Sequence, residues 1–238
     1  MRINIPEEFL NSKSVDNGFY FKYDGDFYSN RFDVIIKILS ECKTARCIDV
    51  GAVGYIPNIK KSIEKGEWLH KIIQENSEEL IGVDINKEGI SYCEALGYEN
   101  ILYANIEEDV EEILKAFNDN PIDYIFFGEM LHEVDDPIGM LSRIHTRYKN
   151  YVKSIVITVP SIYRIQNILY ALKGIDKNHT ENRFWYSPYS LCKMVSMAGY
   201  SVKDIYLSGK ISGRFLKYLN FIFKNNICSE HIILKADL

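Results

Sequence analysis

The sequence lacks the patterns that mark zinc knuckles, disulfide frameworks and membrane spans. It has five cysteines in 238 residues, and no two of them are spaced C-x-x-C, which argues against a zinc knuckle or a redox pair. We therefore expect reduced thiols and a cytoplasmic protein. No apolar run approaches the ~18 residues of a membrane span. The opening segment, MRINIPEEFL, contains no apolar stretch of the kind found in signal peptides.

A basic excess is also absent. The formal net charge is -5 and the isoelectric point is about 5.6, whereas nucleic-acid-binding proteins generally present a basic surface. We therefore expect no nucleic-acid partner. The chain is 47% hydrophobic and 26% charged, which is typical of a globular protein and excludes wholesale disorder. It has no internal repeat and no low-complexity linker, and the sequence leaves the oligomeric state open.

Short apolar runs alternate with amphipathic segments along most of the chain. Strands are predicted at 45–50, 80–85, 101–104, 123–127, 154–159, 202–207 and 231–235, and helices at 31–43, 57–76, 87–96, 107–117, from 136 onward and at 187–198. This alternation predicts an α/β fold with a central, mostly parallel, seven-stranded sheet, helices on both faces and one antiparallel edge strand. In such sheets, ligands bind beyond the carboxyl ends of the strands.

The same pattern predicts one domain over residues 31–238, with an insertion at 161–186 between its fifth strand and the next helix. Residues 1–30 form an irregular N-terminal arm that is rich in phenylalanine and tyrosine. Because aromatic side chains usually pack, the arm could lie on the domain. The alternative is that it forms a lid over a ligand.

Two strand ends carry residues suited to holding a nucleoside. A glycine-containing turn, Asp49-Val-Gly51-Ala-Val-Gly54, follows the first predicted strand, and Gly51 has no Cβ to block a close backbone approach. Asp84 follows the second strand, where a carboxylate can accept hydrogen bonds from both ribose hydroxyls, each contributing roughly 1.5–3 kcal/mol. The alternative role of Asp84 is to cap the helix predicted from Lys87.

Taken with Gly128 and Glu129 after the fourth strand, these motifs resemble those of the class I S-adenosylmethionine-dependent methyltransferases, over roughly residues 31–208. The resemblance implies a Rossmann-like fold and S-adenosyl-L-methionine as the cofactor. It also implies a cofactor site made of Asp49, Gly51, Ala52, Gly54, Asp84, Ile85, Asn105, Ile106, Gly128 and Glu129.

Within that site, Asn105 stands where the family usually has an aspartate. Its carbonyl oxygen can still accept a hydrogen bond from the adenine amino group, with the Ile106 backbone facing the ring. The alternative is an ordinary turn asparagine. Val53 and Tyr55 replace glycines that are common in the family loop, so the chain departs from the family pattern there.

Three further segments point to a smaller group within the family. W-L-H at 68–70, G-E-M-L-H-E-V at 128–134 and H-x-x-N-R-F-W-Y-S at 179–187 are similar to bacterial methyltransferases found with surface-polysaccharide genes. The insertion interleaves aromatic side chains with polar ones, which suits a sugar or other polyhydroxylated acceptor. The alternative is a surface flap of ordinary composition.

The candidate catalytic residues are His132 and Glu133, directly after the fourth-strand turn, and His179 in the insertion. His132 is the first candidate for a general base, because a neutral imidazole is available near pH 7, and His179 is the second. The alternative for His132 is a packed or capping side chain. Asp135 and Asp136 are expected to cap a helix.

No metal site is predicted, since Val159, Pro160 and Ser161 after the fifth strand offer no carboxylate. Residues 210–224 carry four cations and no acid. They could bind an anionic acceptor at a membrane surface or pack on the sheet as an ordinary helix.

The predicted function is therefore O-methylation of a glycan or small polyhydroxylated acceptor, with S-adenosylmethionine as the methyl donor. Two alternatives remain at this point. One is a methyltransferase-like binding protein without activity. The other is a nicotinamide-dependent reductase, although that enzyme would require a G-x-G-x-x-G loop that the chain does not have.

Overall fold

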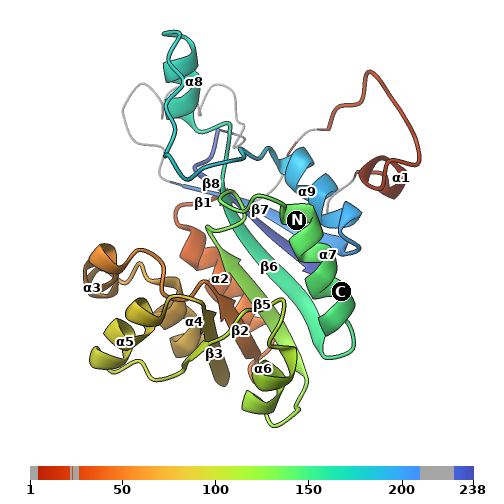
Figure 1. The fold of residues 1–238 in the computed structure, drawn as a ribbon. Helices are drawn as coiled ribbons and strands as arrows, with labels where there is room; N and C mark the ends of the chain where they lie inside the picture. The colour runs from red at the N-terminus through yellow and green to blue at the C-terminus, as the bar shows by residue number, and fades with distance from the viewer. Residues whose placement is uncertain (1–4, 22, 24–26, 210–227) are drawn as a thin grey trace.

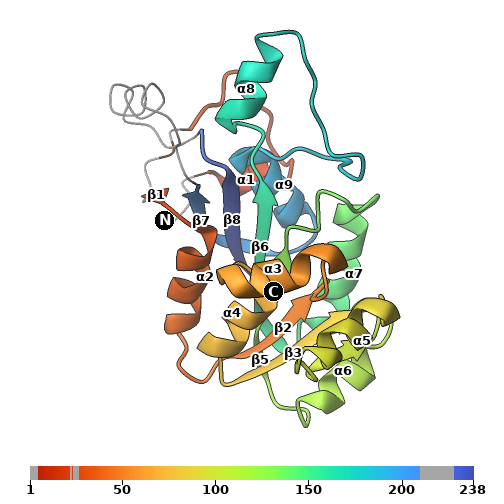
Figure 2. The ribbon, with the colours of Figure 1, turned by 90° about the vertical axis from the view of Figure 1, so that its left-hand side faces the viewer.

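The computed structural model describes residues 5–21, 23, 27–209 and 228–238 as one sheet with helices on both faces (Figures 1 and 2). The strands are β1 (Phe27–Tyr28), β2 (Arg46–Val50), β3 (Glu79–Asp84), β4 (Ile101–Tyr103), β5 (Ile122–Gly128), β6 (Val152–Pro160), β7 (Ser201–Ser208) and β8 (His231–Asp237). The helices are α1 (Glu7–Leu10), α2 (Arg31–Ser40), α3 (Ile56–Lys65), α4 (Leu69–Asn76), α5 (Lys87–Ala95), α6 (Val110–Ala116), α7 (Pro137–Tyr148), α8 (Ile165–Ala171) and α9 (Pro188–Met197).

The sheet is mixed and mostly parallel, which confirms the predicted fold class. Its order is β1-β7-β8-β6-β5-β2-β3-β4, and β4, β3, β2, β5 and β6 are parallel to one another. The antiparallel strand β8 lies between β6 and β7 near one margin, and the two-residue strand β1 extends that margin by pairing with β7. The sheet of the described residues thus has one short strand beyond the seven predicted.

Two hydrophobic layers hold the helices against the sheet. Alternate residues of β5 face opposite sides, since side chains alternate along a strand. Ile125 and Phe127 pack in the layer under α7 and α9, whereas Tyr124 and Phe126 pack in the layer under α2 and α4. All four side chains are buried. This two-sided burial accounts for the apolar runs that marked the central strands in the sequence.

The single helix predicted over 57–76 is wrong, because the structure has two helices there. Helix α3 ends at Gly66, whose φ of 67° is the left-handed conformation that glycine adopts without strain. The chain then turns, and α4 begins after Trp68. The break lets α3 lie beyond the carboxyl edge of the sheet while α4 packs on its face (Figure 2).

The arm and the insertion lie around the carboxyl edge of the sheet. In the arm, the Phe19 ring is 5.9 Å from the Tyr189 ring of α9, and Lys193 Nζ donates to the Phe9 carbonyl. Helix α8, inside the insertion, stands beyond the end of β6 (Figure 1). The cationic segment 210–224 lies outside the described residues. Within the described chain, no helix has the length and apolar character needed to cross a membrane.

Candidate functional site

The site lies where the order of the parallel strands reverses. The neighbours β2 and β5 are followed by connections that lead to opposite sides of the sheet, and ligands bind at such a switch point. Gly51, directly after β2, has a φ of 71°, and its N–H donates to the Val83 carbonyl at 2.9 Å. A Cβ on Gly54 would meet no atom within 4 Å. The glycine turn is therefore hydrogen-bonded to β3 at Gly51 and has free space beside it at Gly54.

Asp84 holds this turn from the end of β3. One carboxylate oxygen accepts from Val53 N–H at 3.0 Å and the other from Asn86 N–H at 2.9 Å. Asn86, not Asp84, caps α5 through Gly89 N–H, so the helix-capping alternative is wrong. A carboxylate has about four lone-pair sites. Two of them remain on Asp84 for the hydroxyls of a ribose.

Asp49 has a different surrounding from the one predicted. Its carboxylate is buried and lies 3.1 Å from His70 Nδ1 of α4, and the other ring nitrogen of His70 is 3.2 Å from Asn100 Oδ1. Burial raises the pKa of Asp49, and the hydrogen bond to His70 opposes that rise. Asp49 thus supports the glycine turn through a buried contact with His70. Its partner in this structure is therefore a side chain of the protein.

The segment after β4 forms a closed turn. Asn105 Oδ1 accepts from Glu107 N–H at 3.0 Å, as a turn asparagine does, and the Ile106 carbonyl accepts from the Tyr148 hydroxyl. The Ile106 side chain is buried in the core. By contrast, Ile85 is 70% exposed at the end of β3. It offers an apolar surface beside Asp84.

Glu129 begins the turn after β5 in a left-handed conformation, with a φ of 54°. Its carboxylate accepts from Arg31 Nη1 at 2.9 Å and lies 3.3 Å from His231 Nδ1. Burial alone would raise the pKa of Glu129, but the hydrogen bond from His231 and the charge of Arg31 lower it to about 2. Just before it, a Cβ on Gly128 would lie 2.2 Å from the Leu69 side chain. Glycine at 128 therefore lets α4 approach β5 closely.

The three catalytic candidates come together. His132 is buried, and its Nε2 lies 3.5 Å from Glu133 Oε1. Glu133, His179 and Glu181 each bring one nitrogen or oxygen atom within 4.8 Å of the others. Burial lowers the pKa of His132, which keeps its imidazole neutral.

The insertion is fastened to this cluster by its backbone. The His132 carbonyl accepts from the N–H groups of Arg183 at 2.8 Å and Phe184 at 3.2 Å. Arg183 also pairs with Asp135, while Asp136 caps α7 through Gly139 N–H at 2.9 Å. Capping is therefore confirmed for Asp136 but is wrong for Asp135. The contacts fix the second half of the insertion beside the end of β5.

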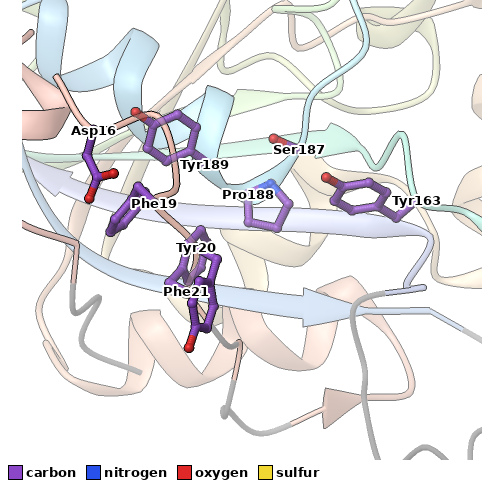
Figure 3. Close-up of a pocket in the computed structure, with 8 residues that line it drawn as sticks. All are labelled: Asp16, Phe19, Tyr20, Phe21, Tyr163, Ser187, Pro188 and Tyr189. Carbon is purple, nitrogen blue, oxygen red and sulfur yellow. The ribbon is translucent and has the colours of Figure 1, made fainter.

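Two pockets open near the same edge. One, of about 360 Å³, lies between the arm and the start of α9, where Phe19, Tyr20 and Phe21 face Pro188 and Tyr189 (Figure 3). The other, of about 430 Å³, lies inside the insertion. Its polar and aromatic lining includes Asn167, Tyr170, Asp176, Lys177 and Trp185.

Comparison with known proteins now bears on this geometry. Residues 66–151 match the family model described as a methyltransferase domain. This segment holds Asp84, Asn105 and the turn from Gly128 to Glu133. This part of the chain is similar to methyltransferase domains. The match supports an S-adenosylmethionine-dependent methyltransferase over a nicotinamide-dependent reductase.

Solved structures share the methyltransferase fold. A SAM-dependent methyltransferase from Archaeoglobus fulgidus is 19% identical, with a TM-score of 0.53, covering 88% of this chain and 95% of that one. One from Clostridium acetobutylicum is 14% identical, with a TM-score of 0.53, covering 90% and 93%. The small RNA methyltransferase HEN1 is 14% identical, with a TM-score of 0.58, covering 87% of this chain and 24% of its own. None of the curated proteins compared with the chain matches it.

The methyltransferase turn fits its cofactor. The left-handed Gly51, the open space above Gly54 and the free lone pairs of Asp84 leave room and hydrogen-bond acceptors at the end of β2 and β3. Asp84 would hold the ribose there, and Ile85 would lie against the base. When bound, the cofactor supplies a methyl group on a sulfonium ion, which is already activated for transfer.

Several residues at the rim were not predicted. Arg31 and His231 lie far from the strand-end motifs in sequence, so nothing local marks them. Glu181 is different, since it stands two residues after His179 and an acidic residue beside a candidate histidine is a visible signal. The W-L-H segment was noted only as a resemblance, yet Trp68 Nε1 donates to the Ala52 carbonyl at 3.0 Å and His70 holds Asp49.

Proposed function

We propose that the protein methylates a hydroxyl group of a sugar, glycan or similar polyhydroxylated acceptor. The observation that carries this proposal is the insertion pocket of about 430 Å³, which presents Trp185, Tyr170, Asn167, Asp176 and Lys177 beside an apolar wall. That wall is formed by Ile162, Ile168, Ala171, Gly174 and Ile175. Aromatic faces stack on sugar rings, and the amide, carboxylate and ammonium groups bond hydroxyls in both directions. The acceptors of surface-polysaccharide synthesis belong to this chemical class.

The contacts of the insertion support delivery of such an acceptor to the rim. The backbone bonds from Arg183 and Phe184 to the His132 carbonyl hold the insertion beside the turn after β5. Trp185, which lines the insertion pocket, follows Phe184 directly in the chain and so connects the pocket to this junction. His132 is our candidate to accept the hydroxyl proton. Positioning of the methyl donor and the acceptor supplies the larger share of the lowering of the activation barrier, about 7–11 kcal/mol against about 3–5 kcal/mol for a general base.

The test is a radiolabelled methyl-transfer assay over a panel of acceptors. We expect transfer to one or more nucleotide-sugars or oligosaccharides, and Trp185→Ala should raise KM for that acceptor by at least about tenfold, because stacking on the indole is lost. Affinity for S-adenosylhomocysteine should not change in this variant. Transfer only to an RNA oligonucleotide, the substrate class named for HEN1, or only to a nitrogen or sulfur acceptor, would reject the proposal.

The free thiols of all five cysteines, each in the described part of the chain, support the proposed cytoplasmic location.

A further inference from the structure

The cluster beside the rim contains more metal-binding groups than the proposed methyl transfer requires. Glu133 comes from the turn after β5, whereas His179 and Glu181 come from the insertion, 46 or more positions away in the chain. Each of the three places one nitrogen or oxygen atom within 4.8 Å of the other two. Ligand atoms around a first-row transition ion lie about 2.0–2.2 Å from it. Small side-chain rotations would therefore close the three groups on one ion.

The three side chains are exposed enough to make those rotations, and their present contacts are long. Glu133 Oε1 lies 3.5 Å from His132 Nε2, and His179 Nδ1 lies 3.8 Å from Glu181 Oε2. The exposed fractions are 39% for Glu133, 65% for His179 and 67% for Glu181. Their backbones are fixed relative to one another, since the His132 carbonyl accepts from Arg183 and Phe184. The ligand-bearing segments are thus held together by bonds that do not involve the ligands.

A fourth side chain points to an occupant in this cluster. The His132 side chain is only 8% exposed, and its Nε2 faces Glu133 Oε1 at 3.5 Å. Its Nδ1 is buried and makes no hydrogen bond to any described residue. A buried polar atom without a partner costs about 1–3 kcal/mol. The Nε2 side of this ring faces the cluster, so a water molecule or hydroxyl group held there by an ion would lie within reach of Nε2.

We propose that Glu133, His179 and Glu181 bind one divalent transition-metal ion. One imidazole and two carboxylates form a mixed nitrogen and oxygen set, which suits Mn²⁺ or Zn²⁺ and not a soft ion that prefers thiolates. Three protein ligands leave coordination positions open, as in catalytic metal sites. If the proposed acceptor is correct, its hydroxyl groups take those open positions beside His132. The metal site itself does not depend on that acceptor.

The experiment measures metal binding without cofactor or acceptor. The full chain is stripped with a chelator and titrated with Mn²⁺, and the free ion is followed by electron paramagnetic resonance. A parallel equilibrium dialysis uses Zn²⁺. We expect one ion per chain, with affinity lowered at least about tenfold in both His179→Ala and Glu181→Gln, because each removes one of three ligands. Glu111→Gln, which changes an exposed acid in the first turn of α6, is the matched control and should bind as the unmodified chain does.

Binding of neither ion, or binding that survives both ligand variants, would overturn the metal site. Such a result would leave the proposed acceptor untouched, since the methyl-transfer panel tests it separately. Circular dichroism of each variant checks the fold. Because His179 and Glu181 are exposed, we expect their substitution to leave the spectrum unchanged.

Discussion

The two halves of the carboxyl rim are built differently. In the cofactor half, at the ends of β2 and β3, Asp49 is buried against His70, and Asp84 bonds two backbone N–H groups. In the acceptor half, made of the turn after β5 and the insertion, His179 and Glu181 are more than 60% exposed. Buried, bonded side chains prepare a site for one fixed ligand, whereas exposed side chains on a fixed backbone can adapt to the ligand that arrives.

The comparison predicts unequal losses of stability when one histidine is removed from each half. His70→Ala leaves the buried Asp49 carboxylate without its partner, which should lower the free energy of unfolding by about 3–5 kcal/mol. His179→Ala changes an exposed side chain and should cost less than about 0.5 kcal/mol. Urea unfolding followed by circular dichroism measures both. Equal losses in the two variants would show that the halves do not differ in this way.

A second prediction concerns turnover and His132, the buried histidine of the acceptor half. His132→Ala should lower turnover by about 10²–10⁴-fold if His132 accepts the hydroxyl proton. Calorimetric titration with S-adenosylhomocysteine should show unchanged affinity, because His132 lies outside the cofactor half. A variant with normal turnover would remove His132 from the reaction.

The ion pairs of Glu129, at the start of the turn after β5, should respond to pH. The pKa of Glu129 is about 2 in the folded protein, against 4.5 as its ordinary value. A lowered folded pKa means that the carboxylate stabilises the fold fully above about pH 4.5. That stabilisation, roughly 3 kcal/mol, is lost as the pH falls toward 2.

The measurement is the free energy of unfolding across this acidic range, in the unmodified chain and in Glu129→Gln. The unmodified chain should lose stability more steeply as the pH falls, because the variant has no carboxylate to protonate at 129. Parallel curves would mean that Arg31 and His231 do not hold Glu129 as the structure describes.

The last prediction concerns the cofactor half alone. Asp84→Ala should weaken binding of S-adenosylhomocysteine at least about tenfold, since two ribose hydrogen bonds to a charged acceptor are lost. The control is Glu111→Ala, at an exposed position on α6. Unchanged affinity in Asp84→Ala would withdraw the ribose assignment, and Asp84→Asn would then show whether the carboxylate serves only to hold Val53 and Asn86.

The sequence was informative where function follows a strand end and silent where it depends on packing. Asp84 and Gly51 could be predicted because a buried strand followed by a polar or glycine residue is a local pattern. Arg31 and His231 could not, because they reach Glu129 from a helix and a strand that only the folded sheet brings together. The break at Gly66 was missed although it carries a local signal, because a glycine directly after a lysine is typical of a helix end.

The indole of Trp68 has a use beyond its bond to the Ala52 carbonyl. The chain has only two tryptophans, and they fall on opposite sides of the rim, Trp68 behind the glycine turn and Trp185 in the insertion pocket. Replacing either one with phenylalanine leaves a single tryptophan, which can be excited at wavelengths that the 17 tyrosines do not absorb. The emission of Trp68 alone then reports binding of the methyl donor, and the emission of Trp185 alone reports binding of the acceptor. Neither measurement needs an added label.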